Sequence, residues 1–266
     1  AGPMARTVAD AALLLTAMAG SDAADAATRQ ADNRRARDYS ASLQRDGLKG
    51  ARIGVVRNRL FGYSPGADAL ADAAIADLTR EGAVIVDPAP IPTLGKFDDS
   101  ELDVLFYEFK ADLNKYLSAL GDSTSVHTLQ DIIAFNAAHK TDELRYFGQE
   151  RFFEAQAKGS LATKVYQDAL TKNHSLAREQ GIDAAVKKFK LDVLIAPTRV
   201  PAWLTDLING DRSSNSCTSL PAVAGYPHIT VPVGYVHGLP VGISFFGVAW
   251  SEPKLISLAY AFEQMT

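Results

Sequence analysis

A strand–helix–strand pattern in residues 52–86 restricts the possible folds of this chain. Residues 52–56, RIGVV, predict a buried strand, and the alanine-rich residues 67–81 predict a helix that Gly82 ends. Residues 83–86, AVIV, predict a second strand. A βαβ unit of this length places its two strands parallel and joins them by a right-handed crossover.

Three later segments add strands to this pair. Residues 191–196, LDVLIA, form a continuous apolar run of the kind that is buried on both faces of a parallel sheet. Residues 228–233 and 241–246 predict two further strands, and the turn at residues 236–240, VHGLP, predicts that they form an antiparallel hairpin. The sequence therefore predicts an α/β fold, a mixed β-sheet flanked by helices.

The first helix has a clear start. Thr7 and Asp10 have the spacing of a capping box, in which the hydroxyl and the carboxylate each accept a backbone N–H of the first turn. Gly20 is placed to end this helix in a left-handed conformation. The helix is expected to bury one stripe, formed by Val8, Ala11, Ala12, Leu15 and Met18.

Helices dominate the middle of the chain, and polar residues 21–50 predict a surface excursion before it. Apolar residues at helical spacing predict helices at 98–119, 129–139 and about 161–189, which together form a mostly helical insertion at about 96–190. A short helix at 220–224 and a last helix at 252–264 are also expected.

Composition excludes several classes of protein. The chain has 27 basic and 31 acidic residues, a net charge of −4, so it lacks the basic surface that binding to nucleic acid requires. No apolar run approaches the roughly 20 residues of a membrane helix, and neither a membrane partner nor a signal peptide is expected. A single cysteine excludes an internal disulfide and leaves both cytoplasm and periplasm open as compartments. The first residue is Ala1 and not Met, which is expected if the sequence is a piece of a longer polypeptide.

Common catalytic and cofactor motifs are missing from the sequence. There is no Rossmann glycine fingerprint, P-loop, H-E-x-x-H or G-x-S-x-G. The five histidines have no metal-ligand spacing, so no metal site is expected and each is interpreted as an ordinary surface or helix-end residue: His127, His139, His174, His228 and His237.

Three groups of polar residues are catalytic candidates by residue type. Cys217 could act as a nucleophile only if a base lowered its pKa, and the nearest histidine in sequence is His228, across a predicted helix. The acidic residues at 98–103 stand at a predicted helix start, where negative charge is favoured by the helix dipole. The hydroxyl-rich residues 213–216, SSNS, have no neighbouring lysine or histidine and are interpreted as loop.

Several longer segments resemble the amidase signature family. The first match covers residues 2–15, GPMARTVADAALLL, which resemble the segment directly downstream of that family's catalytic core. Residues 192–198 (DVLIAPT), 222–232 (AVAGYPHITVP) and 238–243 (GLPVGI) follow in the family's order. The bacterial peptide amidase branch is most similar, through residues 107–110 (YEFK), 135–139 (FNAAH) and 249–256 (AWSEPKLI).

The resemblance implies that residues 1–266 are the C-terminal part of a single amidase domain of the α/β/α sandwich type, here incomplete. Such enzymes hydrolyse carboxamides through a serine nucleophile, a second serine in a cis peptide and a lysine, without metal or organic cofactor. All three residues precede the segment that is residues 2–6 here, so no catalytic residue is expected in this chain, which alone is expected to be inactive. The expected partners are an amide substrate and the missing N-terminal half, with self-association as the alternative to that half.

The same resemblance implies that this half contributes walls of the substrate cleft. Phe109, Trp203, Ser216 and Cys217 are the substrate-binding candidates. Glutamine-using relatives tend to carry an acid at the position of Ser216, and a neutral residue there favours a substrate without a free α-amino group, such as a C-terminal peptide amide, from which ammonia would be released. Ser213 and Ser214 are not expected to replace the missing catalytic serines.

A function of another class is also compatible with these residues. The chain would then be a non-catalytic α/β binding or interaction module derived from an amidase scaffold. The two interpretations differ in whether an upstream Gly/Ser-rich segment and lysine accompany this chain.

Overall fold

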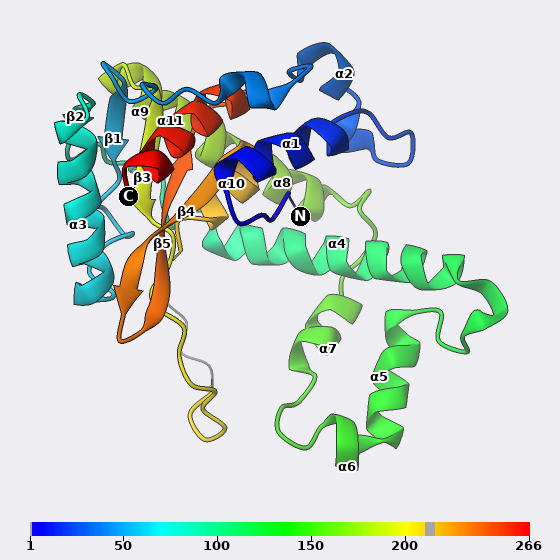
Figure 1. Ribbon diagram of the computed structural model, residues 1–266. Coiled ribbons are helices and arrows are strands. Elements are labelled where there is room, and N and C mark those ends of the chain that lie inside the picture. Colours follow the sequence, from blue (N-terminus) through cyan, green and yellow to red (C-terminus); the bar gives the residue numbers. More distant parts are fainter. Residues whose placement is uncertain (1, 211–215) are drawn as a thin grey trace. The chain divides into compact units, whose positions relative to one another are not determined.

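A five-stranded mixed sheet organises the computed structural model, which describes residues 2–210 and 216–266 (Figure 1). The strand order is β2–β1–β3–β5–β4, with β1 parallel to β2 and β3, and β5 antiparallel to β3 and β4. The strands are β1 (Arg52–Val55), β2 (Val84–Val86), β3 (Val193–Pro197), β4 (His228–Val236) and β5 (Leu239–Phe246). The predicted α/β class, the parallel pair and the antiparallel hairpin are confirmed.

The chain divides into two compact units. The described residues up to 94, from 177 to 205 and from 216 onwards form the first unit, which contains the whole sheet. Residues 95–176 and 206–210 belong to the second unit, which is helical.

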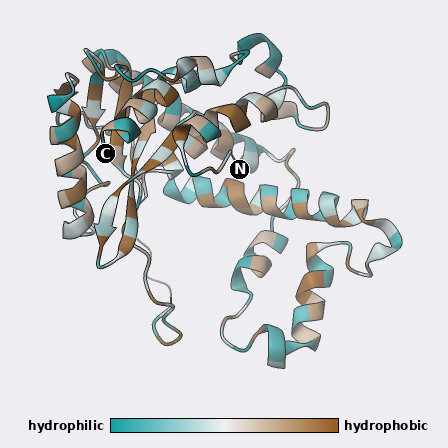
Figure 2. Ribbon diagram, in the orientation of Figure 1, coloured by the Kyte–Doolittle hydropathy of each residue, from teal (hydrophilic) through white to brown (hydrophobic). Residues whose placement is uncertain are grey.

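One face of the sheet forms the main hydrophobic core of the first unit. Helices α1 (Val8–Met18), α3 (Pro65–Arg80) and α11 (Glu252–Met265) supply residues to the same cluster as the strands. Val193, Ile195 and Phe245 are fully buried in it, and the Phe245 ring lies 5.9 Å from that of Phe262. In Figure 2 the hydrophobic colouring of β3 and β5 gathers at the centre of the sheet. The burial of these rings and branched side chains holds α11 on the sheet.

The turn between β4 and β5 has the geometry that the sequence suggested. His237 and Gly238 both have positive φ, 51° and 79°, as the two central residues of a type I′ hairpin turn do. The pairing shifts between Pro232 and Gly234, where β4 contains a bulge.

Helix α1 begins at the predicted residue with half of the predicted capping box, and it ends differently. The Thr7 side chain accepts the Asp10 N–H as expected, but the Asp10 carboxylate accepts the Thr7 hydroxyl instead of a backbone N–H. The helix ends at Ala19 in an extended conformation, φ −70° and ψ 130°. The prediction that Gly20 ends the helix in a left-handed conformation is therefore wrong. Met18 is 54% exposed, so the buried stripe is shorter than expected.

The remaining elements of the first unit are short. The polar residues 21–50 contain η1 (Ala26–Thr28), α2 (Ala31–Arg34) and η2 (Tyr39–Ser42), and Tyr39 is buried in the core. A π-helical turn, η4 (Arg178–Ile182), leads into α9 (Asp183–Phe189). Helix α10 (Ser219–Ala224), the predicted short helix, ends at Gly225 in a left-handed conformation with a φ of 65°.

The second unit consists of helices around two small clusters. One is formed by Val104, Tyr107 and Tyr166, and the other by Leu129, Ile133 and Ala155. Its helices are α4 (Asp98–Ala119), η3 (Gly121–Ser123), α5 (Leu129–Ala138), α6 (Lys140–Glu143), α7 (Glu150–Gln156) and α8 (Lys164–Ala177). In neither unit do the described residues include a helix long and apolar enough to cross a membrane.

Candidate functional site

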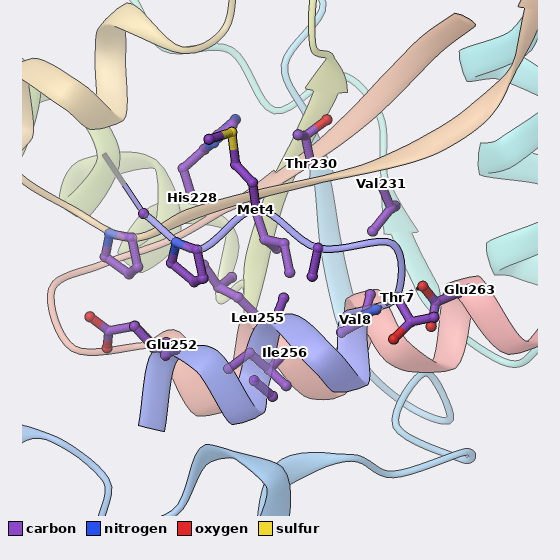
Figure 3. A pocket seen from close by; sticks show the side chains of 18 of the residues that line it. Met4, Thr7, Val8, His228, Thr230, Val231, Glu252, Leu255, Ile256 and Glu263 are labelled. Carbon is purple, nitrogen blue, oxygen red and sulfur yellow. Dashed lines mark hydrogen bonds between the residues drawn. The ribbon is translucent and has the colours of Figure 1, made fainter. Parts of the chain in front are cut away.

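A groove lies beside the first residues of β4 in the first unit (Figure 3). Its volume is about 590 Å³. Four parts of the unit line it: residues 2–7, the first two turns of α1, residues 227–232 and one side of α11. Most of the lining is apolar, and its side chains include Met4, Leu15, Ile229, Val231, Leu255 and Ile256.

Three charged residues line this groove, Arg6, Glu252 and Glu263. Burial raises the pKa of Glu252 above its usual value. Glu263 accepts a hydrogen bond from the backbone N–H of Val8 at 2.8 Å. That carboxylate therefore stands at the N-terminus of α1, where the helix dipole favours negative charge.

Four polar side chains form a continuous hydrogen-bonded chain at the groove, which we call the hydroxyl chain. Thr230 Oγ1 lies 2.6 Å from Thr198 Oγ1, and Thr198 Oγ1 lies 2.8 Å from Ser244 Oγ. Ser244 Oγ in turn lies 2.7 Å from His228 Nε2. The two ends of the chain, Thr230 and His228, both line the groove.

The sheet register brings these four residues together. Ser244 on β5 pairs with Ala196 on one side and Thr230 on the other, and Thr198 directly follows β3. His228 and Thr230 are two residues apart on β4 and so project to the same face. Ser244 is fully buried, so its hydroxyl needs the two partners it has.

Ser216 and Cys217 join the same region through the carbonyl oxygen of Thr198. Ser216 Oγ donates to that oxygen at 3.0 Å, and Cys217 Sγ donates to it at 3.6 Å. Cys217 is 1% exposed, and burial raises the pKa of its thiol to about 11. Because the thiolate is the reactive form of cysteine, this thiol is poorly suited to nucleophilic attack.

His228 lies close to the thiol without activating it. The distance from Cys217 Sγ to His228 Nε2 is 3.9 Å, and burial lowers the pKa of His228. A histidine kept neutral provides no positive charge to stabilise a thiolate. The described residues contain no group of three or more His, Cys, Asp or Glu side chains able to hold a metal ion.

The predicted substrate-binding residues are distributed over both units. Ser216 and Cys217 meet at Thr198, as described above. Trp203, 37% exposed, lies against Arg199, whose guanidinium carbon is 5.0 Å from the indole ring. Phe109 belongs to α4 of the second unit, where its ring stacks on that of Phe152 at 5.8 Å. Ser213 and Ser214 lie outside the described residues.

The sequence interpretation missed the hydroxyl chain. The sequence predicts an ordinary surface or helix-end residue at His228, and this prediction is wrong: His228 is a partly buried strand residue hydrogen-bonded to Ser244. Two signals mark single members of the hydroxyl chain, although neither shows that the members lie together. Thr198 follows a fully apolar strand directly, and Ser244 is the one hydroxyl within the apolar residues 241–246.

Comparison with solved structures places this fold among amidases. The native peptide amidase from Stenotrophomonas maltophilia is 46% identical and superposes with a TM-score of 0.90, covering 100% of this chain and 53% of that one. An amidase family protein from Bacillus anthracis is 34% identical, with a TM-score of 0.79, and covers 99% of this chain and 47% of its own. The fold is thus that of part of an amidase.

Sequence comparison agrees with the structures. The amidase family profile matches residues 1–256. A probable amidase from Arabidopsis thaliana is 38% identical over 272 residues, which cover 100% of this chain and 48% of that protein. The chain belongs to the amidase family, and it spans about half the length of these relatives.

Proposed function

We propose that this chain is the C-terminal portion of a serine-dependent amidase that hydrolyses carboxamides, in particular the C-terminal amides of peptides, and releases ammonia. The observation that carries the proposal is the 46% identity to a peptide amidase over the whole of this chain. Residues 1–266 would form part of a single amidase domain, and the helical residues at about 96–190 would be an insertion in it.

Amide hydrolysis needs a nucleophile, a proton donor for the departing ammonia and N–H groups that stabilise the oxyanion. The one cysteine of this chain is a poor nucleophile, because its thiol is buried and its pKa is raised to about 11. The nucleophilic serine, the cis-peptide serine and the lysine of the proposed mechanism would come from sequence outside this chain. No metal or organic cofactor takes part in this mechanism.

Substrate binding is the role proposed for residues of this chain. Ser216, Cys217, Trp203 and Phe109 would contribute to the walls of the substrate cleft. Ser216 presents a neutral hydroxyl, and a neutral wall suits a peptide amide better than a substrate with a charged α-amino group.

The missing half of the domain would cover the groove and the outer edge of β4. No strand among the described residues pairs with that edge. Gly247 N–H donates to Pro227 O, so residues 227, 229 and 231 face β5, and the backbone groups of His228 and Thr230 point outward. Met4, Leu13 and Met18 are 88%, 56% and 54% exposed, which adds apolar surface for a partner.

Ammonia release from a blocked peptide amide, N-acetylphenylalaninamide, tests the proposal. We expect release by this chain joined to its N-terminal half, and none above background by residues 1–266 alone. Cys217→Ser in the joined protein is the matched variant: as a change in the wall of the cleft it should affect KM at most and keep most of kcat. Release by the isolated chain, or loss of kcat in Cys217→Ser with the fold retained, would contradict the proposal that the catalytic groups lie outside this chain.

Size-exclusion chromatography with light scattering tests the proposed partner. The N-terminal half should convert the isolated chain into a stoichiometric complex. An isolated chain that stays monomeric and does not bind that half would instead favour the alternative, a non-catalytic binding or interaction module.

A further inference from the structure

The four groups of the hydroxyl chain carry one proton more than the three hydrogen bonds between them use. Three hydroxyl groups and a neutral imidazole carry four protons, and three hydrogen bonds link Thr230, Thr198, Ser244 and His228. Each link takes one proton, so one proton remains. That proton points outward from one end of the chain, either at His228 Nδ1 or at Thr230 Oγ1.

The two ends are therefore coupled. If Nδ1 carries the imidazole proton, Nε2 accepts from Ser244, Ser244 accepts from Thr198, and Thr198 accepts from Thr230, which then presents only lone pairs. If Nε2 carries the proton, every hydrogen bond reverses, Thr230 donates outward and Nδ1 accepts. Among the described residues no hydrogen-bond partner of Nδ1 is found, and both end residues line the groove.

We propose that the hydroxyl chain is a binding site for a neutral amide group, with His228 and Thr230 as its complementary donor and acceptor, and that it discriminates against a carboxylate. An amide offers one C=O acceptor and one N–H donor, which match one donating and one accepting end. A carboxylate only accepts, and a chain with a single outward proton can satisfy one of its oxygens. The inference rests on the proposed function only in naming the amide substrate as the ligand.

The spacing of the two ends suits this ligand. His228 and Thr230 are two residues apart along a strand, about 7 Å between Cα atoms. With a hydrogen bond of about 2.9 Å on each side, one amide group spans a gap of that order. The amide has two possible sources: a substrate, or a backbone peptide group of the missing half of the domain.

Protonation of His228 would remove the preference of the hydroxyl chain for an amide over a carboxylate. The imidazolium carries a fifth proton, so both ends donate and a carboxylate is accepted at both. Cys217, before α10, is the titratable group next to His228, with Sγ 3.9 Å from Nε2. Arg6, Glu252 and Glu263 are the charged residues that line the groove; Glu252 and Glu263 stand on α11, which packs with Val231 on the face of β4 opposite to His228 and Thr230. Glu252→Gln separates the titration of the acid from that of His228.

The experiment compares N-acetylphenylalaninamide with N-acetylphenylalanine in the full-length protein that carries this chain. The ratio of the dissociation constant of the acid to that of the amide, taken from inhibition and KM or from calorimetry, measures discrimination. We expect this ratio to fall about tenfold as His228 becomes protonated, in wild type and in Glu252→Gln. A ratio that does not change with pH would overturn the proposal.

Breaking the chain gives a sharper result. Ser244→Ala lets His228 Nδ1 and Thr230 donate outward independently, so the acid should bind about tenfold more tightly relative to the amide at neutral pH. Ser257→Ala, another buried serine outside the chain, is the control and should leave the ratio unchanged. If Ser244→Ala does not fold, Thr198→Val breaks the same chain. If a folded variant keeps the wild-type ratio of the two dissociation constants, the two ends of the hydroxyl chain are not coupled and the proposal is wrong.

Nitrogen-15 NMR of labelled histidine separates this proposal from the proposed function and identifies the source of the amide. If the amide ligand shifts the His228 tautomer and the acid does not, the proposal stands even when no ammonia is released. If instead joining the N-terminal half alone fixes the tautomer and added amide has no effect, the ligand is a backbone amide of that half. A tautomer that responds to neither contradicts the proposal.

Discussion

Val8 N–H donates a 2.8 Å hydrogen bond to Glu263 Oε1, across 255 residues of sequence. The contact joins the first turn of α1 to the last turns of α11, and both helices belong to the core that covers one face of the sheet. It satisfies one of the N–H groups that the first turn of a helix leaves without a partner.

Glu263→Ala should lower the free energy of unfolding by about 1 kcal/mol, because it removes an acceptor and a negative charge from the N-terminus of α1. Glu263→Gln keeps an acceptor oxygen and should lose less than half of that. Urea denaturation measures both. Equal losses for the two variants would mean that the charge, and not the hydrogen bond, provides the stabilisation.

Cys217 should resist thiol reagents while the protein is folded. Its side chain is 1% exposed and its pKa is raised to about 11, so at pH 8 the thiolate is about one part in a thousand. Labelling with Ellman's reagent should be at least about 100-fold slower in the native state than in urea. Rapid labelling of the native chain at pH 8 would show that the thiol is exposed and activated.

Stability should decrease as the pH falls below about 6.5 because of His228. Burial lowers the pKa of His228 below its ordinary value of 6.5, so the unfolded chain takes up the proton first and acidification favours unfolding. The contribution of the neutral imidazole is complete above pH 6.5 and is lost as the pH falls through the lowered pKa. His228→Gln should flatten this decline in the Tm, and His127→Gln, in the second unit, should leave it unchanged.

Gly54→Ala should destabilise the sheet by about 1–3 kcal/mol through overpacking. A Cβ at Gly54 would contact Leu191 Cδ1 and lie 2.9 Å from Ala89 Cβ and 3.1 Å from Leu194 Cδ2. Gly2→Ala is the matched control, because nothing lies within 4 Å of a Cβ there. Denaturant unfolding measures the free energy of unfolding of both variants. If Gly54→Ala is as stable as the wild type, β1 can shift to make room for the added Cβ.

Local signals explain why most of the fold could be predicted. The Thr7 cap, Gly82, Gly225 and the turn at His237–Gly238 are determined by one or two residues each, and the structure contains all of them. Gly20 was misjudged because Ala19 leaves the helix in an extended conformation one residue earlier. A glycine after a helix permits a left-handed cap without requiring one.

The hydroxyl chain could not be predicted by the same means. Its members stand at residues 198, 228, 230 and 244 and come together only through the register of β3, β5 and β4. Each is an ordinary polar residue in its own segment, and sequence spacing gives no sign that they are neighbours. The family resemblance predicts Ser216 and Cys217 as substrate-binding residues, and the structure adds that both contact the Thr198 carbonyl.

Proline at position 232 limits what can be added to the sheet. The outward backbone positions of β4 are 228, 230 and 232, and proline has no N–H to donate at the third. An incoming strand can therefore form a regular ladder only over the first few residues of β4, before the bulge at Gly234 turns the edge away. The sequence of β4 therefore limits the length and register of any strand that pairs with this edge. The same limit protects the edge against aggregation with other chains.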